Sequence, residues 1–301
     1  PTRRRPPMLP EPHPFPTTHH TSLPAGRLSA GGPLLGVWAH PDDEAFMSAG
    51  LMAAARRDGR RVVILTMTAG ELGTADPARW PAARLGALRR HELRAGLAAL
   101  DVTEHHVVGL PDGGCERFDA TPLIERAMRD VRPATIVTFG PDGFTGHPDH
   151  KAVHRWTTRA WRATGHRGTL LYATVTPSFH TDFAHLNDAV RLWSVGDGRR
   201  AATPEAALSH RIRLSGHDLD QKVAALRAHA SQTSGMIAAV GEDAFRRWWA
   251  DESFVAAHPR DRGRAVTRRG PGRSPAAPRA MAAAASSPGP AVRDPRRERT
   301  G

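Results

Sequence analysis

The chain has 301 residues, enough for one large domain or two small ones, and a net charge of +12 with a pI near 11.3. Such a charge ordinarily favours nucleic acid or another acidic partner. However, residues 1–30 carry +3 and residues 258–301 carry +8, so residues 31–257 are nearly neutral. We therefore expect no nucleic-acid-binding surface on the central part of the chain.

Apolar runs and longer helix-forming segments alternate through the first half of the chain. Runs rich in β-branched residues predict strands, and longer segments without proline predict helices. The predicted strands are Leu34–Ala39, Arg61–Met67, Val102–Val108, Thr135–Phe139 and Thr169–Thr176, and the predicted helices are Glu44–Asp58, Ala82–Leu100, Thr121–Val131 and Asp149–Ala163. This alternation predicts an α/β fold, namely a Rossmann-like, doubly wound, mostly parallel sheet with helices on both faces.

The pattern weakens after Pro177. The elements predicted there are two helices, Asp218–Ser231 and Glu242–Trp249. Residues 1–30 and 258–301 are rich in proline, and the second of these segments is also rich in arginine and alanine. Neither segment has enough apolar surface to form a core. We therefore expect a single catalytic domain at residues 31–257, between a disordered leader and a disordered tail.

Two clusters of histidine and acidic residues each follow a predicted strand. The first is Ala39-His40-Pro41-Asp42-Asp43-Glu44 and the second is His147-Pro148-Asp149-His150. Open α/β sheets keep their sites at the carboxyl ends of their strands, so we expect the two clusters to meet there.

The residues of the two clusters suit a catalytic metal ion. Such a zinc ion takes three protein ligands and leaves one position for water, and His40, Asp43 and His150 supply two imidazoles and a carboxylate. Asp42 is then free to act as the general base towards that water. His147 is free to stabilise a developing oxyanion or to protonate a leaving amine. The sequence therefore predicts a metal-dependent hydrolase, with zinc as the ion and another divalent metal such as Fe²⁺ as the alternative.

Each cluster also has a purely structural interpretation. The three acidic residues of the first cluster would complement the dipole at the start of a helix. The histidines of the second would lie on the surface around a proline turn. A shared metal site explains both clusters together.

Three segments resemble a known family. These are His40-Pro41-Asp42-Asp43-Glu44, then Gly70-Glu71-Leu72-Gly73, then His147-Pro148-Asp149-His150. Together they are similar to the LmbE-like, or PIG-L, zinc N-deacetylases, and the resemblance extends from about Leu34 to about Gln232. It implies zinc ligation by His40, Asp43 and His150, general-base catalysis by Asp42, and support of the tetrahedral intermediate by His147.

The resemblance also implies residues that contact substrate. Arg89, three residues before Glu92, and Asp112 match positions that bind sugar hydroxyls in the family. A solvated helix arginine and an ordinary turn aspartate remain equally open for these two. Glu71, in the glycine-rich loop beside the expected site, is a further candidate for lining the pocket.

A few other residues invite interpretation. His229 lies on an apolar helix and Trp248–Trp249 form an aromatic pair, so we expect them to pack in the core, with a role in the site as the alternative. Cys115 is the only cysteine, which excludes an internal disulfide and a cysteine-based zinc site.

The sequence predicts a cytoplasmic protein without a membrane span. No apolar run approaches the roughly 18 residues that a spanning helix needs. Arg3–Arg5 resemble the start of an export signal, but the segment after them is proline-rich and polar. A homo-oligomer is left open.

We therefore expect a hydrolase that removes an acyl group, usually acetyl, from the nitrogen of an amino sugar or its conjugate. A water molecule held at the metal would attack the amide, with Asp42 as general base. One alternative is an amidase of the same fold that acts on a thiol conjugate. Another is a non-catalytic module that binds sugar or nucleic acid.

Overall fold

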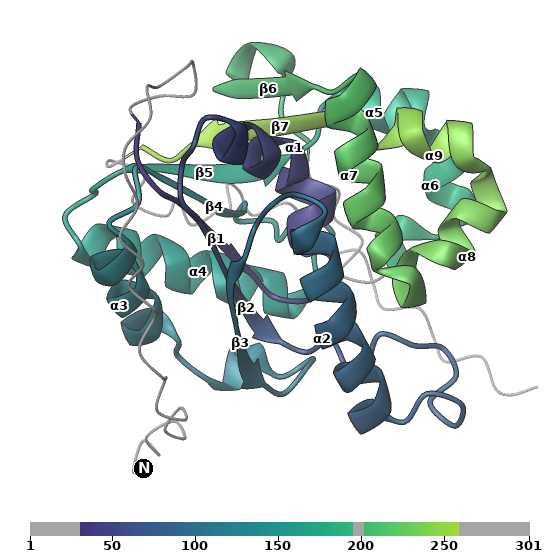
Figure 1. The fold of residues 1–301 in the computed structure, drawn as a ribbon, viewed down its shortest axis with the longest axis horizontal. Helices are drawn as coiled ribbons and strands as arrows, with labels where there is room; N and C mark the ends of the chain where they lie inside the picture. Colours follow the sequence, from purple (N-terminus) through teal and green to yellow (C-terminus); the bar gives the residue numbers. More distant parts are fainter. Residues whose placement is uncertain (1–30, 195–201, 259–301) are drawn as a thin grey trace, which may run out of the picture. The chain divides into compact units, whose positions relative to one another are not determined.

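A seven-stranded sheet organises the part of the chain that the computed structural model describes, residues 31–194 and 202–258 (Figure 1). Its spatial order is β3-β2-β1-β4-β5-β7-β6. The strands are β1 (Leu34–Trp38), β2 (Val62–Thr68), β3 (Glu104–Leu110), β4 (Thr135–Phe139), β5 (Thr169–Thr174), β6 (His210–Arg213) and β7 (Asp251–Ala256). Strands β1 to β5 are parallel to one another, whereas β7 pairs antiparallel with both β5 and β6. The predicted fold class is confirmed.

Helices cover both faces of this sheet (Figure 1). They are α1 (Asp43–Arg57), α2 (Ala82–Ala98), α3 (Thr121–Val131), α4 (Pro148–Ala163), α5 (Pro177–Asp182), α6 (Ala184–Ala189), α7 (Gly216–Ala228), α8 (Ala230–Val240) and α9 (Glu242–Trp248), with short 3₁₀ turns at Cys115–Arg117, Leu192–Ser194 and Glu205–Ala207. The chain winds outward from β1 to β3 and then returns to β4, so right-handed crossovers place α1 and α2 on one face and α3 and α4 on the other. Helix α7 packs against α1 and α2.

The central strands are apolar because they are covered on both faces. Every residue of β1, β2 and β4 is buried. Trp38 of β1 and Phe139 of β4 meet edge to face, with ring centroids 5.0 Å apart. Consecutive apolar positions are the expected signature of such strands.

The sheet reverses its winding between β1 and β4, which are neighbours in space but far apart in the chain. The segments that leave the carboxyl ends of these two strands diverge to opposite faces of the sheet. A crevice opens at such a point, and ligands of doubly wound folds bind there. The two histidine clusters follow these two strands.

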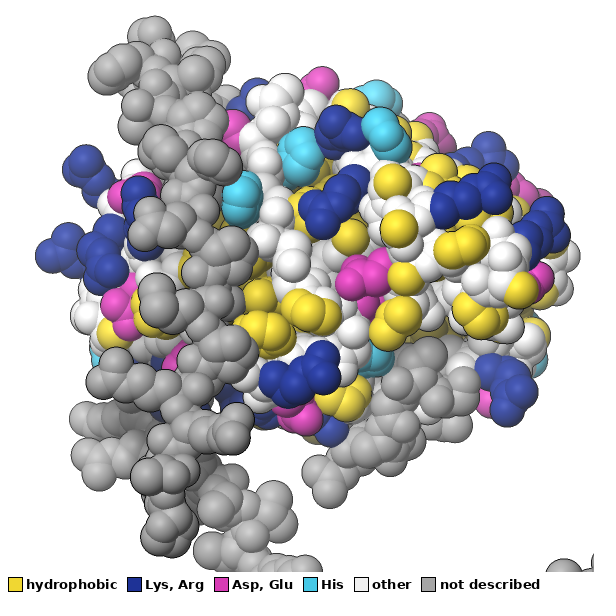
Figure 2. Space-filling view, turned by 90° about the horizontal axis from the view of Figure 1, so that it is seen from below, with side chains coloured by type: hydrophobic (Ala, Val, Ile, Leu, Met, Phe, Trp, Pro, Cys, Tyr) yellow, Lys and Arg dark blue, Asp and Glu magenta, His cyan; other side chains and the backbone are white. Residues whose placement is uncertain are grey.

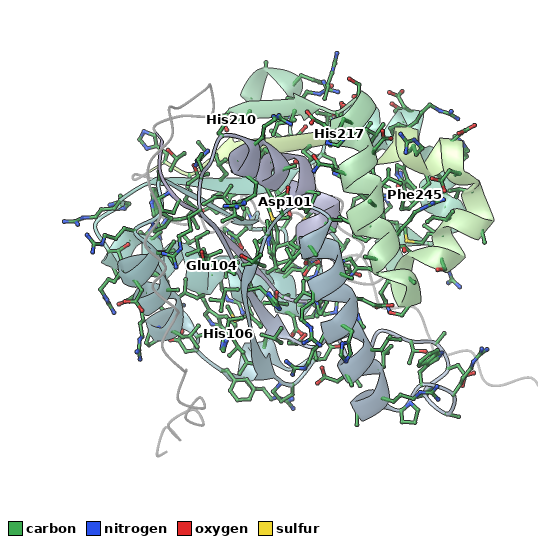
Figure 3. All side chains as sticks on the ribbon, viewed as in Figure 1. Asp101, Glu104, His106, His210, His217 and Phe245 are labelled. Atoms are coloured by element: carbon green, nitrogen blue, oxygen red, sulfur yellow. The ribbon has the colours of Figure 1, made fainter. Side chains whose placement is uncertain are left out.

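The second half of the chain contains elements that the sequence did not predict. Strands β6 and β7 are short and carry charged residues, so they lack the apolar run that marks β1, β2, β4 and β5. The helix predicted at Asp218–Ser231 is two helices, because the chain breaks at His229, between α7 and α8. Phe245 of α9 is fully buried and lies among α7, α8 and α9 (Figure 3).

The predicted leader (residues 1–30) and nearly all of the predicted tail (residues 258–301) lie outside the described residues. All described residues belong to one compact unit of the chain. Among their helices, none combines the length and apolar character that crossing a bilayer requires.

A buried ion pair ties the last strand to the first helix. Lys222 Nζ of α7 lies 2.9 Å from Glu252 Oε1 of β7, and both side chains are fully buried. Lys222 also donates to the carbonyl oxygen of Phe46 (2.8 Å), and Glu252 accepts from the backbone N–H groups of Gly50 (2.8 Å) and Leu51 (3.0 Å). Phe46 C=O and Gly50 N–H are the two partners of one regular helical hydrogen bond. The ion pair therefore engages the backbone of α1 in the middle of the helix.

We expect Lys222→Met to lower the free energy of unfolding by about 3–5 kcal/mol, because it leaves the Glu252 carboxylate buried without its cation. Arg57→Met is the matched control, since Arg57 is paired with Asp218 on the surface and such pairs contribute about 1 kcal/mol or less. Urea denaturation followed by circular dichroism measures both. Equal losses in the two variants would contradict a structural role for the buried pair.

Candidate metal centre and catalytic cavity

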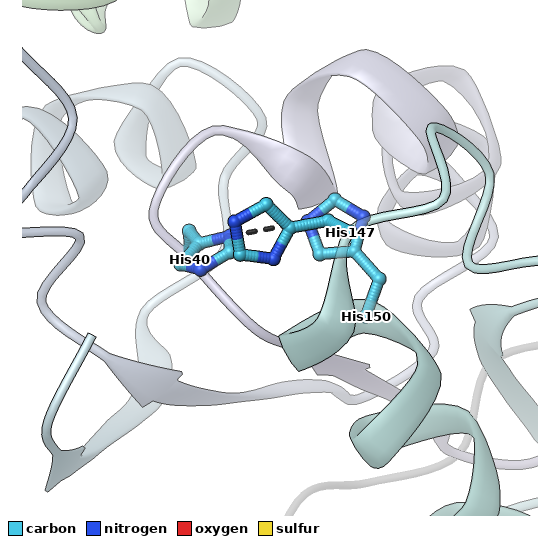
Figure 4. Close-up of side chains that lie close together, drawn as sticks. All are labelled: His40, His147 and His150. Carbon is cyan, nitrogen blue, oxygen red and sulfur yellow. Dashed lines mark hydrogen bonds between the residues drawn. The ribbon is translucent and has the colours of Figure 1, made fainter. Parts of the chain in front are cut away.

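The two histidine clusters meet at the carboxyl ends of β1 and β4. His40 comes from the segment between β1 and α1, whereas His147 and His150 stand at the start of α4, and Figure 4 shows their three rings together. His40 Nδ1 lies 3.1 Å from His150 Nε2. This arrangement agrees with the prediction from the sequence that the two segments converge.

Hydrogen bonds on the far side of each ring determine which nitrogens face the centre. His150 Nδ1 lies 2.9 Å from the carbonyl oxygen of Gly143, an acceptor, so the proton of the neutral ring is on Nδ1. His40 Nε2 lies 3.1 Å from Asp112 Oδ1 and 3.4 Å from Asp149 Oδ2, so its proton is on Nε2. The two remaining nitrogens then point lone pairs at each other across 3.1 Å. A proton that turns this contact into a hydrogen bond satisfies both nitrogens, and so does a shared metal ion.

Asp43 completes this donor set. Its Oδ1 lies 3.4 Å from His150 Nε2, and its Oδ2 lies 3.6 Å from His40 Nδ1. The backbone N–H of His40 also donates to Asp43 Oδ2 at 2.8 Å, which fixes the carboxylate. A tetrahedral zinc ion with bonds of about 2.0–2.2 Å holds its ligand atoms roughly 3.4 Å apart. The separations of 3.1, 3.4 and 3.6 Å lie near this value, with a different oxygen of Asp43 facing each ring.

Two other groups of side chains share His40. One is His40, His147 and His150, and the other is His40, Asp112 and Asp149, each with potential ligand atoms within 4.8 Å of one another. The second group differs from the first, because Asp112 and Asp149 accept hydrogen bonds from the His40 ring itself. Carboxylates behind a histidine in this way orient the ring and strengthen it as a ligand.

The electrostatics of the cluster favour one additional positive charge. Burial lowers the pKa of His40, but its hydrogen bonds to Asp112 and Asp149, with the charge of Asp43, outweigh burial and raise that pKa to about 10. Burial raises the pKa of Asp43 to about 7, against the charge of His40. Burial and the neighbouring charges of His40 and His147 hold the pKa of His150 well below its ordinary value. A proton on His40 or a divalent ion supplies the missing charge.

Asp149 is a residue of the second cluster to which the sequence assigned no role. Its Oδ2 accepts from the backbone N–H of Gly113 at 2.8 Å, and its Oδ1 accepts from that of Cys115 at 3.0 Å. The carboxylate thus joins the turn after β3 to His40. The sequence signal for a role of Asp149 was its position inside the second motif. Its hydrogen-bond partners could not be predicted from the sequence.

Asp42 adopts a strained backbone conformation. Its φ is +104°, a region that residues other than glycine seldom occupy. Its backbone N–H donates to Glu44 Oε2 (3.1 Å), and its Oδ2 accepts from Arg89 Nη2 (3.1 Å). Burial raises the pKa of Asp42, with the charge of Arg89 opposing it. Strain of this kind is characteristic of functional positions.

Arg89 is not the solvated helix arginine of the alternative interpretation, since it is only 4% exposed. Its Nη1 donates to the carbonyl oxygen of Gly70 at 2.7 Å, and its Nη2 donates to that of Pro41 at 2.5 Å. Together with its bond to Asp42, these contacts make Arg89 a clamp on the segment that carries the candidate base.

Asp112 and Glu71 form one connected network beside the centre. The backbone N–H of Leu72 donates to Asp112 Oδ2 (2.8 Å), and the backbone N–H of Asp112 donates to Glu71 Oε1 (3.0 Å). The carboxyl of Asp112 lines the cavity, and its bond from His40 brings its pKa to about 2 although burial acts in the opposite direction. Glu71 is not among the residues that line the cavity.

His147 begins α4 as its N-terminal cap. Its Nδ1 accepts from the backbone N–H of Asp149 at 3.2 Å, so the proton of the neutral ring is on Nε2. Burial and the charge of His40 lower the pKa of His147. The ring lines the cavity with a hydrogen-bond donor available.

Two further predictions concern residues behind the centre. His229 is fully buried, and its Nε2 lies 2.9 Å from Glu44 Oε1, so it supports the residue that holds the N–H of Asp42. Trp248 packs in the core, whereas Trp249 is buried and also lines the cavity. Burial raises the pKa of the Cys115 thiol, which is consistent with an inert side chain.

These residues surround a cavity of about 630 Å³. Its lining includes the three proposed metal ligands together with Asp42, Arg89, Asp112 and His147. This volume is within the range of small-molecule sites.

We expect His150→Ala to abolish metal binding, because it removes one of three converging donors. His154→Ala is the matched control, since His154 lies one turn further along α4 and hydrogen-bonds to the carbonyl oxygen of Phe139. Elemental analysis after dialysis should find about one zinc per chain in the control and almost none in His150→Ala. Equal metal content in both variants would contradict the ligand assignment.

The energetic cost of the backbone strain at Asp42 can be measured by comparing two substitutions. Both Asp42→Gly and Asp42→Ala remove the carboxylate, but only glycine accepts a φ of +104° without cost. We expect the free energy of unfolding of the glycine variant to be about 1–2 kcal/mol higher than that of the alanine variant. A glycine variant less stable than the alanine variant would show that the segment relaxes.

Comparisons with known proteins agree with this geometry. The family described as PIG-L, GlcNAc-PI de-N-acetylase, matches residues 35–161. Two relatives are 1D-myo-inositol 2-acetamido-2-deoxy-alpha-D-glucopyranoside deacetylases. One, from Acidothermus cellulolyticus, is 34% identical over 66% of this chain and 79% of the relative. The other, from Mycobacterium sp. strain KMS, is 34% identical over 69% and 76%.

A solved structure shares the fold. The N,N'-diacetylchitobiose deacetylase from Pyrococcus horikoshii, in complex with its inhibitor MPG, matches with a TM-score of 0.53 and 17% identity over 76% of this chain and 84% of that one. The predicted family resemblance and the prediction of a deacetylating hydrolase are confirmed. The chain belongs to the PIG-L, or LmbE-like, family of de-N-acetylases.

Proposed function

We propose that this protein removes the acetyl group, or another acyl group, from the nitrogen of an amino-sugar conjugate, with a zinc ion held by His40, Asp43 and His150. The observation that carries the proposal is the pair of imidazole nitrogens 3.1 Å apart, with the Asp43 carboxylate beside them in the lining of the cavity. The relatives that deacetylate 2-acetamido-2-deoxy-glucopyranosides of inositol support the substrate class.

Zinc suits this donor set, because two imidazoles and one carboxylate are a common catalytic combination for it. Fe²⁺ also accepts two histidines and a carboxylate, so metal analysis of the purified protein decides between them. When bound, the ion supplies a Lewis acid that acidifies water and polarises an amide carbonyl.

The side chains around the ligands have complementary roles. Asp42 accepts a proton from water, and its burial makes it a stronger base than an exposed carboxylate. Arg89 holds this carboxylate in place while it clamps the carbonyl groups of Pro41 and Gly70. His147 donates from Nε2 to the oxygen that becomes negative as the amide is attacked.

The sugar would be recognised by polar groups at the same cavity. Asp112 accepts from Leu72 N–H and lies beside His40, and a carboxylate retains acceptor capacity for a sugar hydroxyl after two such bonds. Gln232 of α8 adds an amide to the lining. Glu71 would act through Asp112, whose N–H it accepts.

The surface of the described part of the chain does not favour a nucleic-acid-binding module. Figure 2 shows Lys and Arg side chains scattered over one face among acidic and apolar ones.

We further propose that residues 31–257 form the catalytic domain. A cytoplasmic location stays a prediction of the sequence.

The test is release of amine from an N-acetylglucosaminide by the zinc-loaded protein, detected with an amine-reactive fluorophore. We expect Asp42→Asn to retain about one zinc per chain and to lose about 10²–10⁴-fold in kcat. Asp101→Asn, an exposed change before β3 (Figure 3), is the matched control and should retain activity. Activity of Asp42→Asn within tenfold of the parent would refute the role of Asp42, and no amine release from any N-acyl amino sugar would refute the proposed function.

A further inference from the structure

The catalytic cavity has an apolar lining beyond its polar floor. Six of the large apolar side chains that reach it come from five separate parts of the chain: Phe46, Met47, Leu72, Phe144, Met236 and Trp249. Phe46 and Trp249 are in contact, with ring centroids 4.6 Å apart. A sugar–inositol conjugate exposes hydroxyl groups around each ring, and burying them against carbon without partners is unfavourable.

Phe144 is held in this lining by a strained backbone. Its φ is +61°, which is an outlier for a bulky residue, and its side chain is only 3% exposed. The neighbouring loop stabilises this conformation, since the N–H of Phe144 donates to Asp142 Oδ1 at 2.6 Å. The same loop leads into α4 and its metal ligand. Strain maintained at this place is an independent indication that the aromatic side chain has a function.

Leu72 contributes apolar surface on the segment after β2. It is 60% exposed and is the one large apolar side chain of the described residues that is exposed to this degree. Its position is fixed, because its N–H donates to Asp112 and the next residue, Gly73, accepts from Gln232 of α8. Met236 lies one turn beyond Gln232 and lines the same cavity. Together with the buried and half-buried apolar side chains of the lining, the exposed leucine extends one contiguous apolar surface, and such a surface indicates a binding site.

We propose that the substrate carries an apolar group, which these six side chains bind while the amide lies over the metal centre. This inference rests on the proposed deacetylase function and specifies its substrate class. The apolar group is either the aglycone or a long N-acyl chain, since both would extend from the same amino sugar. Full burial of each methylene group would increase kcat/KM by about fourfold.

Two substrate series distinguish these sources with the zinc-loaded protein. The first series comprises the methyl, butyl and octyl glycosides of N-acetylglucosamine. The second comprises the N-acetyl, N-butanoyl and N-octanoyl forms of methyl glucosaminide. We expect kcat/KM to rise by about tenfold or more from the shortest to the longest member of one series. The series that rises identifies the apolar group, whereas flat or falling values in both would overturn the inference while leaving deacetylation of the short substrates intact.

Variants connect the chain-length effect to the lining. Met236→Gln and Leu72→Asn place polar groups of similar size at two of its positions. In the series that rises, each should reduce the ratio of kcat/KM between the longest and the shortest member by about threefold or more, the loss of roughly one methylene contact. Ile237→Gln makes the same kind of change at the next residue of α8, which does not line the cavity, and should keep the parent ratio. Equal ratios in all variants would assign the chain-length effect to another surface.

Measuring ligand binding tests the apolar site without requiring any turnover by the enzyme. Methyl, butyl and octyl glucosides lack an amide, and calorimetric titration of the zinc-loaded protein compares their affinities. Tighter binding with chain length, lost in Met236→Gln, supports the apolar site even if no N-acyl sugar is hydrolysed, in which case the proposed function alone fails. Equal weak binding of all three glucosides would exclude the aglycone as the apolar group and, together with a flat N-acyl series, would overturn the site.

Discussion

The catalytic end of this molecule depends on two imidazole nitrogens, one on His40 and one on His150, that face each other 3.1 Å apart. When both rings are neutral, their lone pairs repel at this distance, and a proton or a metal ion between the two nitrogens removes the repulsion. The groups behind each ring prevent it from turning away: Gly143 binds the far side of His150, and Asp112 and Asp149 bind the far side of His40. The demand for a cation is therefore imposed by acceptors that are not themselves the proposed ligands. The reversal of the sheet between β1 and β4 brings these segments together.

Around this centre the fold maintains two conformations that an isolated chain would avoid. Asp42 and Phe144 both have positive φ values, and they lie on the two segments that leave β1 and β4. Each is held by a neighbouring carboxylate that accepts its backbone N–H: Glu44 for Asp42 and Asp142 for Phe144. The rigid sheet below offsets the cost of such conformations. The protein thus aims one carboxylate and one aromatic ring into the same cavity by the same device.

The sequence predicted those parts of the structure that depend on local pattern. Strands β1, β2 and β4 were recognisable because burial on both faces requires consecutive apolar residues. The two motifs were recognisable because metal chemistry requires particular side chains. Strands β6 and β7 carry charges and exposed positions, so they resembled loops. The role of Asp149 depends on N–H groups 36 and 34 residues earlier in the chain, and the burial of Arg89 depends on the carbonyl groups of Gly70 and Pro41. Such long-range contacts leave no periodic pattern in the sequence, so they could not be predicted from it.

The bond between Gly50 and Glu252 has a consequence for how the chain folds. These residues are 202 positions apart, and the intervening chain includes the parallel strands β2 to β5. Contacts of such long separation form late, because a large loop must close before they are made. Helix α1 contributes Asp43, and its middle is secured only when β7 has paired with β5. During synthesis, the proposed metal centre is therefore expected to reach its final form after nearly all of the described chain has left the ribosome, although its three proposed ligands are present once His150 has been added.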